Sequence, residues 1–327
     1  MTSGSLTFES LLAEPILQYV EAKRALGHRF ATEARTLRLL DRFLIAQSVR
    51  TLDAITPDVV EAFLMSRPRC DPKSYNALLG IVRRLFERMV AQHMIAVSPV
   101  RATPRRELPR RLPFLFDPPQ MRQLLALARQ LPDRNRAPRR GSTYHAIFAL
   151  LYGLGLRVGE VSRLQRGDLD LAQQLLWIRN SKFGKSRLVP FGPRLGTVLR
   201  TYVDRARDQT AAPEAPLFTF DGQHGVHTNS IRNTFRDELL PRLHLRVPPG
   251  TRPPRVHDLR HSFAVGTLLR WYRAGLDPAV RLPHLSTFLG HLNPAATAVY
   301  LTITADLLQE ANRRFSAFAP TAAAVTP

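Results

Sequence analysis

Two short motifs in the second half of the chain place basic side chains at spacings that suit a phosphate group. Arg157 in "GLGLRVGE" precedes Glu160 by three positions, so the acid can fix a guanidinium fork that binds two oxygens. His257 and Arg260 in "VHDLRHSFAVGTLL" share one helical face and can converge on a single ligand. Each motif alone is more simply explained as an intrahelical or surface pair, so its meaning depends on the other basic residues.

Further residues of suitable chemistry follow along the chain. Lys182 and Lys185 flank the turn in "SKFGKSR", from which an ammonium group could reach a bound polyanion, although lysine is also a common loop residue. His291 ends "LGH", and Tyr300 lies in "AVYLT", where it is either a packed aromatic or a nucleophile. A tyrosine hydroxyl has a pKa of about 10, so it needs cationic neighbours or a base to attack near neutrality.

The overall charge indicates a polyanionic partner. The 327 residues include 47 Lys and Arg against 26 Asp and Glu, a formal net charge of +21. Such a surface suits nucleic acid, whose phosphates release counterions on binding. A membrane is the weaker interpretation, because no stretch approaches about 20 apolar residues and "MTSGSLTFES" does not resemble a signal peptide. We expect a cytoplasmic, nucleoid-associated protein with no membrane partner.

The sequence predicts neither a metal nor another cofactor. Cys70 is the only cysteine, which excludes intrachain disulfides and zinc sites built on several thiolates. His224 and His227 in "HGVH" have no third ligand nearby in the sequence and are not interpreted as a metal pair. Carboxylate clusters and phosphate-binding glycine loops are likewise missing from the sequence.

Residues 1–100 form a predicted all-helical module. Their apolar residues recur near i, i+3, i+4 and i+7 in four segments. Thr32, Thr56 and Asp71 occupy the positions expected for N-caps.

Residues 101–112 form a predicted basic linker. Pro104 and Pro109 prevent regular structure, and the surrounding arginines are not balanced by acids. The segment could follow a phosphate backbone, or it could be a solvated surface loop. The residues predicted to bind DNA are Arg101, Arg105, Arg106, Arg110 and Arg111, with Lys185 and Arg187 of the following domain.

Residues 113–315 are mainly helical in pattern, with one exception. The stretch "LLWIRNSKFGKSRLVPF" has β-branched and aromatic residues on both sides of Phe183-Gly184, which predicts a β-hairpin. Trp177, Trp271 and Phe263 are interpreted as core residues. Residues 316–327 form a predicted flexible tail.

In their order along the chain, the basic residues and the tyrosine resemble the tyrosine recombinase, or phage integrase, family. The resemblance covers residues 113–315, and the helical module with its linker corresponds in size and position to the core-binding domain of that family. It implies a mainly α fold with a small β-sheet (α+β) in the catalytic domain, and two domains that form a C-shaped clamp. The implied catalytic residues are Arg157, Lys182, His257, Arg260, His291 and Tyr300, supported by Glu160 and His261.

The resemblance implies a site-specific recombinase that cleaves and rejoins DNA through a 3′-phosphotyrosyl intermediate. Tyr300 would attack phosphorus, and Lys182 would protonate the departing 5′ oxygen. Arg157 and Arg260 would clamp the non-bridging oxygens, to which His291 would add a hydrogen bond. Fixed cations and a proton donor suit a metal-free reaction whose transition state gains negative charge.

Some roles stay open at this point. His257 would either take part in proton transfer at the tyrosine or bind the phosphate, whereas His261 is assigned a structural role. The family hairpin usually reads Gly-Lys-Gly-x-Lys, but Phe183 stands here where a glycine is usual. The Lys-to-Lys and Lys-to-Arg spacings of that hairpin are kept, so Lys182 remains the expected general acid and Lys185 the alternative.

The segments "LDPAVRLPHLSTFLGH" and "YLTIT" resemble the transposon-borne, multi-recombinase-operon branch, which implies integration, excision or transposition of a mobile element. The expected partners are double-stranded DNA sites with inverted repeats, a homotetramer on two such sites, and other recombinases of the same operon. Residues 304–315 could dock on a neighbouring subunit, as we expect, or on their own domain. The alternatives are a catalytically inactive accessory protein and a type IB topoisomerase.

Overall fold

The computed structural model describes residues 7–28, 30–107, 111–179, 186–206, 212–291, 293, 295–298 and 300. The chain divides into two compact units, Met1–Arg110 and Arg111–Pro327, and the division falls inside the predicted linker. Arg110, Lys182, Lys185 and the predicted segments 304–315 and 316–327 lie outside the described residues. Within those residues, no helix combines the length and apolar character needed to span a membrane.

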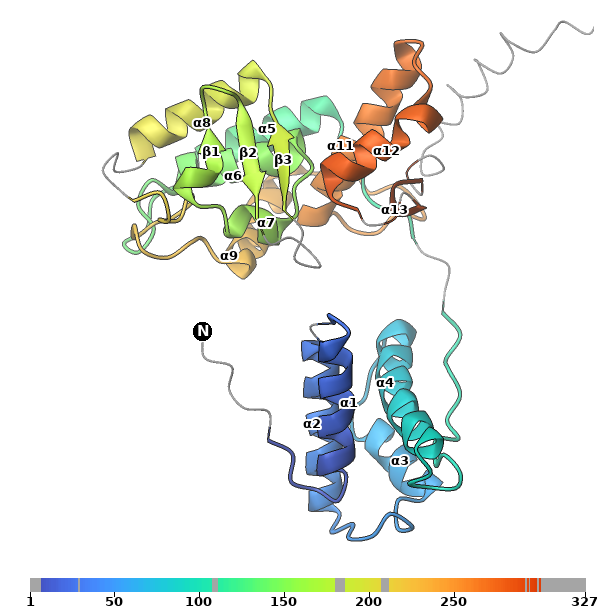
Figure 1. Ribbon diagram of the computed structural model, residues 1–327. Helices are drawn as coiled ribbons and strands as arrows, with labels where there is room; N and C mark the ends of the chain where they lie inside the picture. The colour runs from blue at the N-terminus through green and yellow to red at the C-terminus, as the bar shows by residue number, and fades with distance from the viewer. Residues whose placement is uncertain are drawn as a thin grey trace, which may run out of the picture. The chain divides into compact units, whose positions relative to one another are not determined.

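The first unit is helical throughout its regular structure (Figure 1). α4 is amphipathic, and its buried side chains, among them Leu78, Val82 and Phe86, recur at helical spacing and face α1 and α2. A continuous apolar core follows from this packing. The helices are α1 (Ala13–Ala25), α2 (Ala31–Ala46), α3 (Pro57–Met65) and α4 (Pro72–Ala91).

Two of the three predicted N-caps of this unit are confirmed. Thr56 and Asp71 precede the prolines that begin α3 and α4, and the Asp71 side chain accepts a hydrogen bond from the backbone of Ser74. The prediction for Thr32 is wrong, because α2 already begins at Ala31, after Phe30 in the left-handed conformation.

The first part of the linker, around residues 102 and 105, is anchored along α4. Arg83 donates a hydrogen bond to the carbonyl of Ala102 at 2.6 Å, and Asn76 exchanges two hydrogen bonds with the backbone of Arg105 at 2.8 and 2.9 Å. The Arg105 guanidinium lies 3.9 Å from the centre of the Tyr75 ring. Arg105 was predicted to contact DNA, but here its guanidinium covers an aromatic ring of its own unit.

The second unit combines helices with one small antiparallel sheet of strand order β1-β2-β3. β2 (Leu175–Ile178) and β3 (Arg187–Pro190) pair with Trp177 opposite Leu188, which confirms the predicted hairpin strands. β1 (Leu169–Asp170) is too short to show a strand pattern in the sequence. Trp177 points away from the core and is 48% exposed, so the prediction that it is a core residue is wrong.

α6 is the central helix of this unit, in contact with α5, α8 and α11. Its buried run from Ala146 to Leu151 is apolar on all sides because neighbours surround it. The helices of this unit are α5 (Pro118–Arg129), α6 (Arg140–Gly153), α7 (Val158–Ser162), α8 (Pro193–Ala206), α9 (Thr228–Asn233), α10 (Leu240–Leu243), α11 (Val256–Arg273), α12 (Pro278–Leu289) and α13 (Ala295–Ala298), with a 3-10 turn at Arg166–Asp168 and a π-helical turn at Thr234–Leu239.

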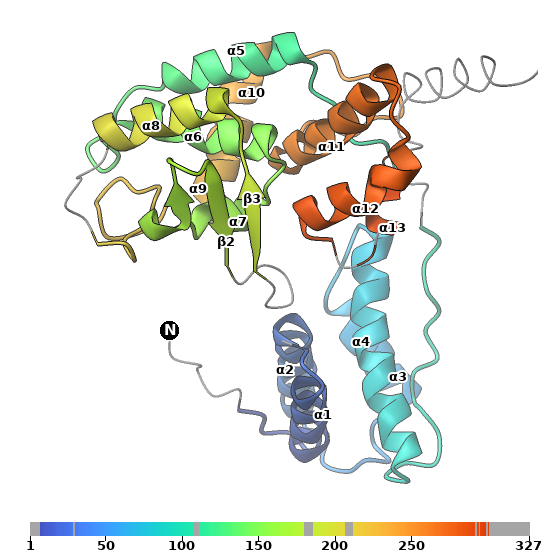
Figure 2. The same ribbon diagram turned by 45° about the horizontal axis from the view of Figure 1, so that its top comes forward.

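α11, α12 and α13 bring the C-terminal part of the unit towards the sheet. In Figures 1 and 2, α11 and α12 lie beyond β3, the strand nearest to them. Tyr300 packs in a separate apolar cluster that includes Leu268 of α11 and Leu285 of α12. These contacts join Tyr300 to α11 and α12, and Arg187 at the start of β3 bonds to Phe288 of α12.

Candidate active site

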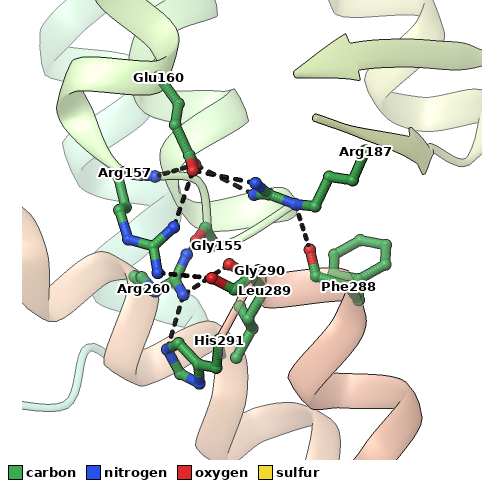
Figure 3. Close-up of polar contacts among 9 residues, drawn as sticks. All are labelled: Gly155, Arg157, Glu160, Arg187, Arg260, Phe288, Leu289, Gly290 and His291. Atoms are coloured by element: carbon green, nitrogen blue, oxygen red, sulfur yellow. Dashed lines mark hydrogen bonds and ion pairs between the residues drawn. The ribbon is translucent and has the colours of Figure 1, made fainter. Parts of the chain in front are cut away.

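Three arginines from different parts of the second unit meet at the C-terminal end of α12 (Figure 3). Arg187 Nε donates to the carbonyl oxygen of Phe288 at 2.8 Å, Arg260 Nη2 to that of Leu289 at 2.8 Å, and Arg157 Nη2 to that of Gly290 at 2.9 Å. The last carbonyl groups of a helix have no partner within the helix and carry its negative dipole end. The end of α12 therefore gathers three positive charges.

Glu160 holds two of these arginines. Its carboxylate accepts hydrogen bonds from Arg157 Nη1 at 2.9 Å and from both Nη atoms of Arg187 at 3.0 and 3.1 Å. It also accepts the backbone N–H of Arg157 at 2.9 Å, as the first turn of α7 begins. The Glu160 side chain is 2% exposed, so these bonds operate away from water. The predicted supporting role of Glu160 agrees with this geometry.

Arg187 differs from its sequence prediction. It was predicted to bind DNA from an exposed hairpin, but its side chain is only 11% exposed and bridges Glu160 and the end of α12. The sequence could not reveal this, because the alternation of β3 gives no sign of the carboxylate and carbonyls that surround the residue.

Two glycines permit this close packing. Gly290 ends α12 with φ +68°, and a Cβ there would lie 2.7 Å from Arg187 Nη1. Gly155 has φ +59°, a Cβ there would lie 2.6 Å from the ring of Phe263, and its carbonyl accepts a hydrogen bond from Arg260 Nη1 at 2.7 Å. Any other residue would strain the backbone and displace a side chain at both positions.

The contacts of His291 define its tautomer. Its Nε2 lies 2.8 Å from Arg260 Nη2, and its Nδ1 lies 2.7 Å from the hydroxyl oxygen of buried Thr297. A guanidinium only donates hydrogen bonds, so Nε2 accepts and the neutral ring carries its proton on Nδ1. To donate Nε2–H to a phosphate, His291 has to gain a proton or exchange its tautomer.

Tyr300 is buried beside this cluster, with 4% of its surface exposed. Its hydroxyl oxygen lies 3.0 Å from His261 Nδ1. Burial raises the pKa of Tyr300 above its usual value, although the charge and hydrogen bond of Arg260 and the charge of Arg157 oppose that rise. The predicted cationic field is present, but the effect of burial on the pKa of Tyr300 is larger.

His257 lies next to this pair. Its ring meets the His261 ring edge to face, with centroids 4.8 Å apart. It also lines a pocket together with Arg232 and Arg255. His257 is thus placed at the edge of the site, beside two further arginines.

The cluster has the chemistry of an anion site. Within the part of the chain that the structure describes, Arg157, Arg187 and Arg260 converge on the end of α12, and Glu160 forms ion pairs with Arg157 and Arg187. A phosphate would offset the remaining positive charge and accept several charge-assisted hydrogen bonds. The described residues contain no cluster of His, Cys, Asp and Glu that could hold a metal ion.

The three site histidines predict acid sensitivity. Burial first, and neighbouring charges second, lower the pKa of His257 and His291 to about 4 and that of His261 to about 3. In an unfolded chain, these histidines bind protons near pH 6.5. The free energy of unfolding is therefore unaffected well above that pH. It falls as the pH drops towards 4, because the unfolded chain then binds more protons than the folded protein. We expect thermal unfolding midpoints to fall over this range, and inorganic phosphate to reduce the fall.

A histidine variant checks the source of this pH dependence. His257→Asn should weaken the acid dependence, while His244→Asn, at an exposed position in the left-handed conformation, should leave it unchanged. Equal acid dependence in His257→Asn and the unchanged protein would contradict the assignment.

A second prediction concerns Arg187. Arg187→Gln should lower the free energy of unfolding by about 3 kcal/mol, because it leaves a buried carboxylate with one arginine fewer. The salt dependence of DNA binding should stay the same, because the guanidinium contacts Glu160. Urea unfolding and DNA titrations at several salt concentrations test both points. A decrease of about one unit in the slope of log binding constant against log salt, with an unchanged free energy of unfolding, would instead support the DNA contact predicted from the sequence.

Comparison with known proteins identifies the family of the chain. Residues 115–306 match the phage integrase family. The integrase/recombinase y4rB of Sinorhizobium fredii is 36% identical over 308 residues, which cover 93% of this chain and 97% of the relative. The tyrosine recombinase XerC of Haemophilus ducreyi is 27% identical over 285 residues, which cover 85% of this chain and 84% of the relative.

Solved structures share the fold at low sequence identity. The Tn1549 transposon integrase in complex with circular intermediate DNA matches with a TM-score of 0.65 at 16% identity, over 94% of this chain and 99% of that one. A lambda integrase dimer bound to a COC′ core site matches with a TM-score of 0.62 at 15% identity, over 90% of this chain and 78% of that one. The chain therefore belongs to the phage integrase family, and it is a tyrosine-type site-specific DNA recombinase.

Proposed function

We propose that the protein cleaves and rejoins DNA strands through a 3′-phosphotyrosyl bond at Tyr300. The observation that carries the proposal is the contact of the Tyr300 hydroxyl with His261, beside the arginine cluster of Arg157 and Arg260. In the proposed step, the Tyr300 oxygen bonds to phosphorus and the bond from phosphorus to the 5′ oxygen breaks. The ester conserves the energy of the broken bond, so the reverse step rejoins the strand.

Arg157 and Arg260 are proposed to bind the non-bridging oxygens of the scissile phosphate. Both guanidinium groups point to the same end of α12, which supports a single anion between them (Figure 3). His291 would join them after protonation, which the negative charge of the phosphate favours. Lys182 is proposed to protonate the 5′ oxygen, and His257 to act in proton transfer or phosphate binding.

We further propose that the reaction moves a mobile element by integration, excision or transposition. Relatives named as integrases and the similarity of the fold to a transposon integrase support this role. The DNA partner would carry inverted repeats bound by a homotetramer, with other recombinases of the same operon as further partners. Residues 304–315 are proposed to dock on a neighbouring subunit.

A nicked substrate tests the proposed chemistry. A duplex that the protein selects from a random-sequence pool, with a nick one nucleotide past the cleavage point, would release the short piece that carries the free 5′ hydroxyl and trap the covalent product. We expect a band of protein linked to DNA that resists denaturation. Binding without such a band would indicate an inactive accessory protein, and relaxation of supercoiled DNA without that sequence would indicate a topoisomerase.

A salt titration tests the contribution of the linker. Arg101 and Arg106 are exposed, so replacing both with Gln should lower the slope of log binding constant against log salt by roughly 2, about 0.9 for each lost phosphate contact. Replacing Arg194 and Arg200, two exposed arginines of α8, removes the same charge elsewhere and should change the slope much less. Equal changes in both double variants would show a nonspecific charge effect.

A further inference from the structure

His261 contacts the group that is proposed to react. It lies on α11, one turn after His257, and its Nδ1 lies 3.0 Å from the Tyr300 hydroxyl oxygen. The sequence assigned His261 a structural role, since it is an extra histidine beside the more prominent His257. A ring nitrogen in contact with the oxygen that is proposed to react can donate a hydrogen bond to it or accept one from it, depending on which nitrogen carries the ring proton.

The opposite nitrogen of His261 faces a group that can only donate. Arg252 Nη2 lies 3.2 Å from His261 Nε2. Because a guanidinium has no acceptor, Nε2 must offer its lone pair in this contact. A neutral ring that accepts at Nε2 carries its proton on Nδ1. That N–H then points at the oxygen of Tyr300.

Arg252 is held in place by a buried carboxylate. The same Nη2 atom donates to Asp258 Oδ1 at 3.0 Å, and Asp258 is fully buried and also accepts the backbone N–H of Arg255 at 2.9 Å. The backbone of Arg252 is bonded as well, because its N–H donates to the carbonyl of Leu112 at 3.0 Å. These bonds keep the donor directed at the ring.

The carboxylate itself does not orient the ring. Asp258 Oδ1 lies 3.9 Å from His261 Nε2, which is beyond hydrogen-bond distance. An arrangement in which Nε2–H donates to Asp258, leaving Nδ1 as an acceptor, is therefore not the one present. Arg252 decides the tautomer, and Asp258 decides the position of Arg252.

We propose that His261 is a catalytic residue that donates its Nδ1–H to the Tyr300 oxygen throughout the attack on phosphorus, with Arg252 and Asp258 as positioning residues. The catalytic part of this inference rests on the proposed function of Tyr300. As the Tyr300 oxygen becomes negative, a neutral hydrogen bond turns into a charge-assisted one, which lowers the energy of the transition state. His261 keeps its proton, so the proton of the tyrosine passes to His257, the neighbouring ring that is proposed to act in proton transfer.

The tautomer can be measured without DNA. In the full chain labelled with ¹⁵N-histidine, long-range proton–nitrogen spectra distinguish protonated from unprotonated ring nitrogens, and the His261→Asn spectrum identifies the His261 signals. Near neutral pH we expect a proton on Nδ1 alone. Arg252→Lys should keep this form, whereas Arg252→Met should allow the other tautomer. A proton on Nε2 in the unchanged protein would overturn the proposal, whether or not Tyr300 is the nucleophile.

Cleavage rates on the nicked substrate test the catalytic part. An Asn amide nitrogen lies about as far along the side chain as Nδ1, so His261→Asn can donate to Tyr300 but cannot act as a base. His261→Leu can do neither. We expect it to cleave roughly ten- to a hundredfold more slowly than the unchanged protein, because it loses one hydrogen bond to a charged group. His261→Asn should cleave much faster than His261→Leu. Equal loss in both variants, with DNA binding and thermal unfolding unchanged, would overturn the donor role.

A charge control completes the design. Arg252→Met should slow cleavage more than Arg252→Lys, because only lysine keeps a donor at Nε2. Arg194→Met removes a positive charge from α8 and should cleave at the unchanged rate. If Arg252→Met cleaved as fast as Arg194→Met, Arg252 would not be a positioning residue. Adducts that persist in Tyr300→Phe would instead refute the proposed function and leave the tautomer result standing.

Discussion

Tyr300→Phe is expected to abolish the covalent protein–DNA product and to leave DNA binding intact. The ring of Tyr300 packs among Leu268, Leu285 and Leu289, and Phe keeps that packing while removing the oxygen that would attack phosphorus. Denaturing electrophoresis of the nicked substrate measures the product, and a mobility shift measures binding. We expect the loss of product to be complete to the limit of detection.

A second tyrosine provides the control. Tyr272 packs against the same apolar cluster from α11, so Tyr272→Phe makes the same chemical change nearby. It should retain both binding and the covalent product. Product formation by Tyr300→Phe, or its loss in both variants, would contradict the assignment of the nucleophile.

Arg260→Lys is expected to have the next largest effect. Arg260 is 1% exposed and joins three parts of the site, through Gly155, Leu289 and His291. A lysine keeps the charge, but its single nitrogen cannot serve these groups and a phosphate in the same geometry. We expect cleavage to slow by about 10²- to 10³-fold, the loss typical of a removed donor to developing negative charge. The free energy of unfolding should fall by about 3 kcal/mol.

Arg270→Lys is the matched control for this variant. Arg270 lies on the same helix, α11, but is exposed. The change should leave cleavage and unfolding close to those of the unchanged protein. Arg260→Lys with a normal cleavage rate would show that the buried guanidinium is a structural group alone.

The order of the residues in the sequence predicted much of the site. Arg157, the pair His257 and Arg260, and the pair His291 and Tyr300 come from three separate parts of the chain, yet the structure brings them together. Their types and their order were sufficient to identify the family. The resemblance to the family therefore predicted long-range contacts that local periodicity does not predict.

The contacts that the sequence did not reveal depend on tertiary partners. The carbonyl groups at the end of α12 belong to Phe288, Leu289 and Gly290, and no side-chain pattern marks a carbonyl as a ligand of arginine. His261 lies on the predicted helical face, but its partners come from a loop before α11 and from a position 39 residues later. Arg187 is largely buried, unlike the exposed basic residues with which it was grouped in the sequence. Positive charge alone does not distinguish a buried arginine from an exposed one.

Identification of the residue that is bonded to DNA tests the central claim most directly. The trapped product would be digested with a protease, and the peptide that remains attached to the DNA would be sequenced by mass spectrometry. We predict a single phosphodiester between the hydroxyl of Tyr300 and the 3′ end of the cleaved strand, with a free 5′ hydroxyl on the released fragment. Attachment at another residue, or a 5′ phosphate on the released fragment, would contradict the account.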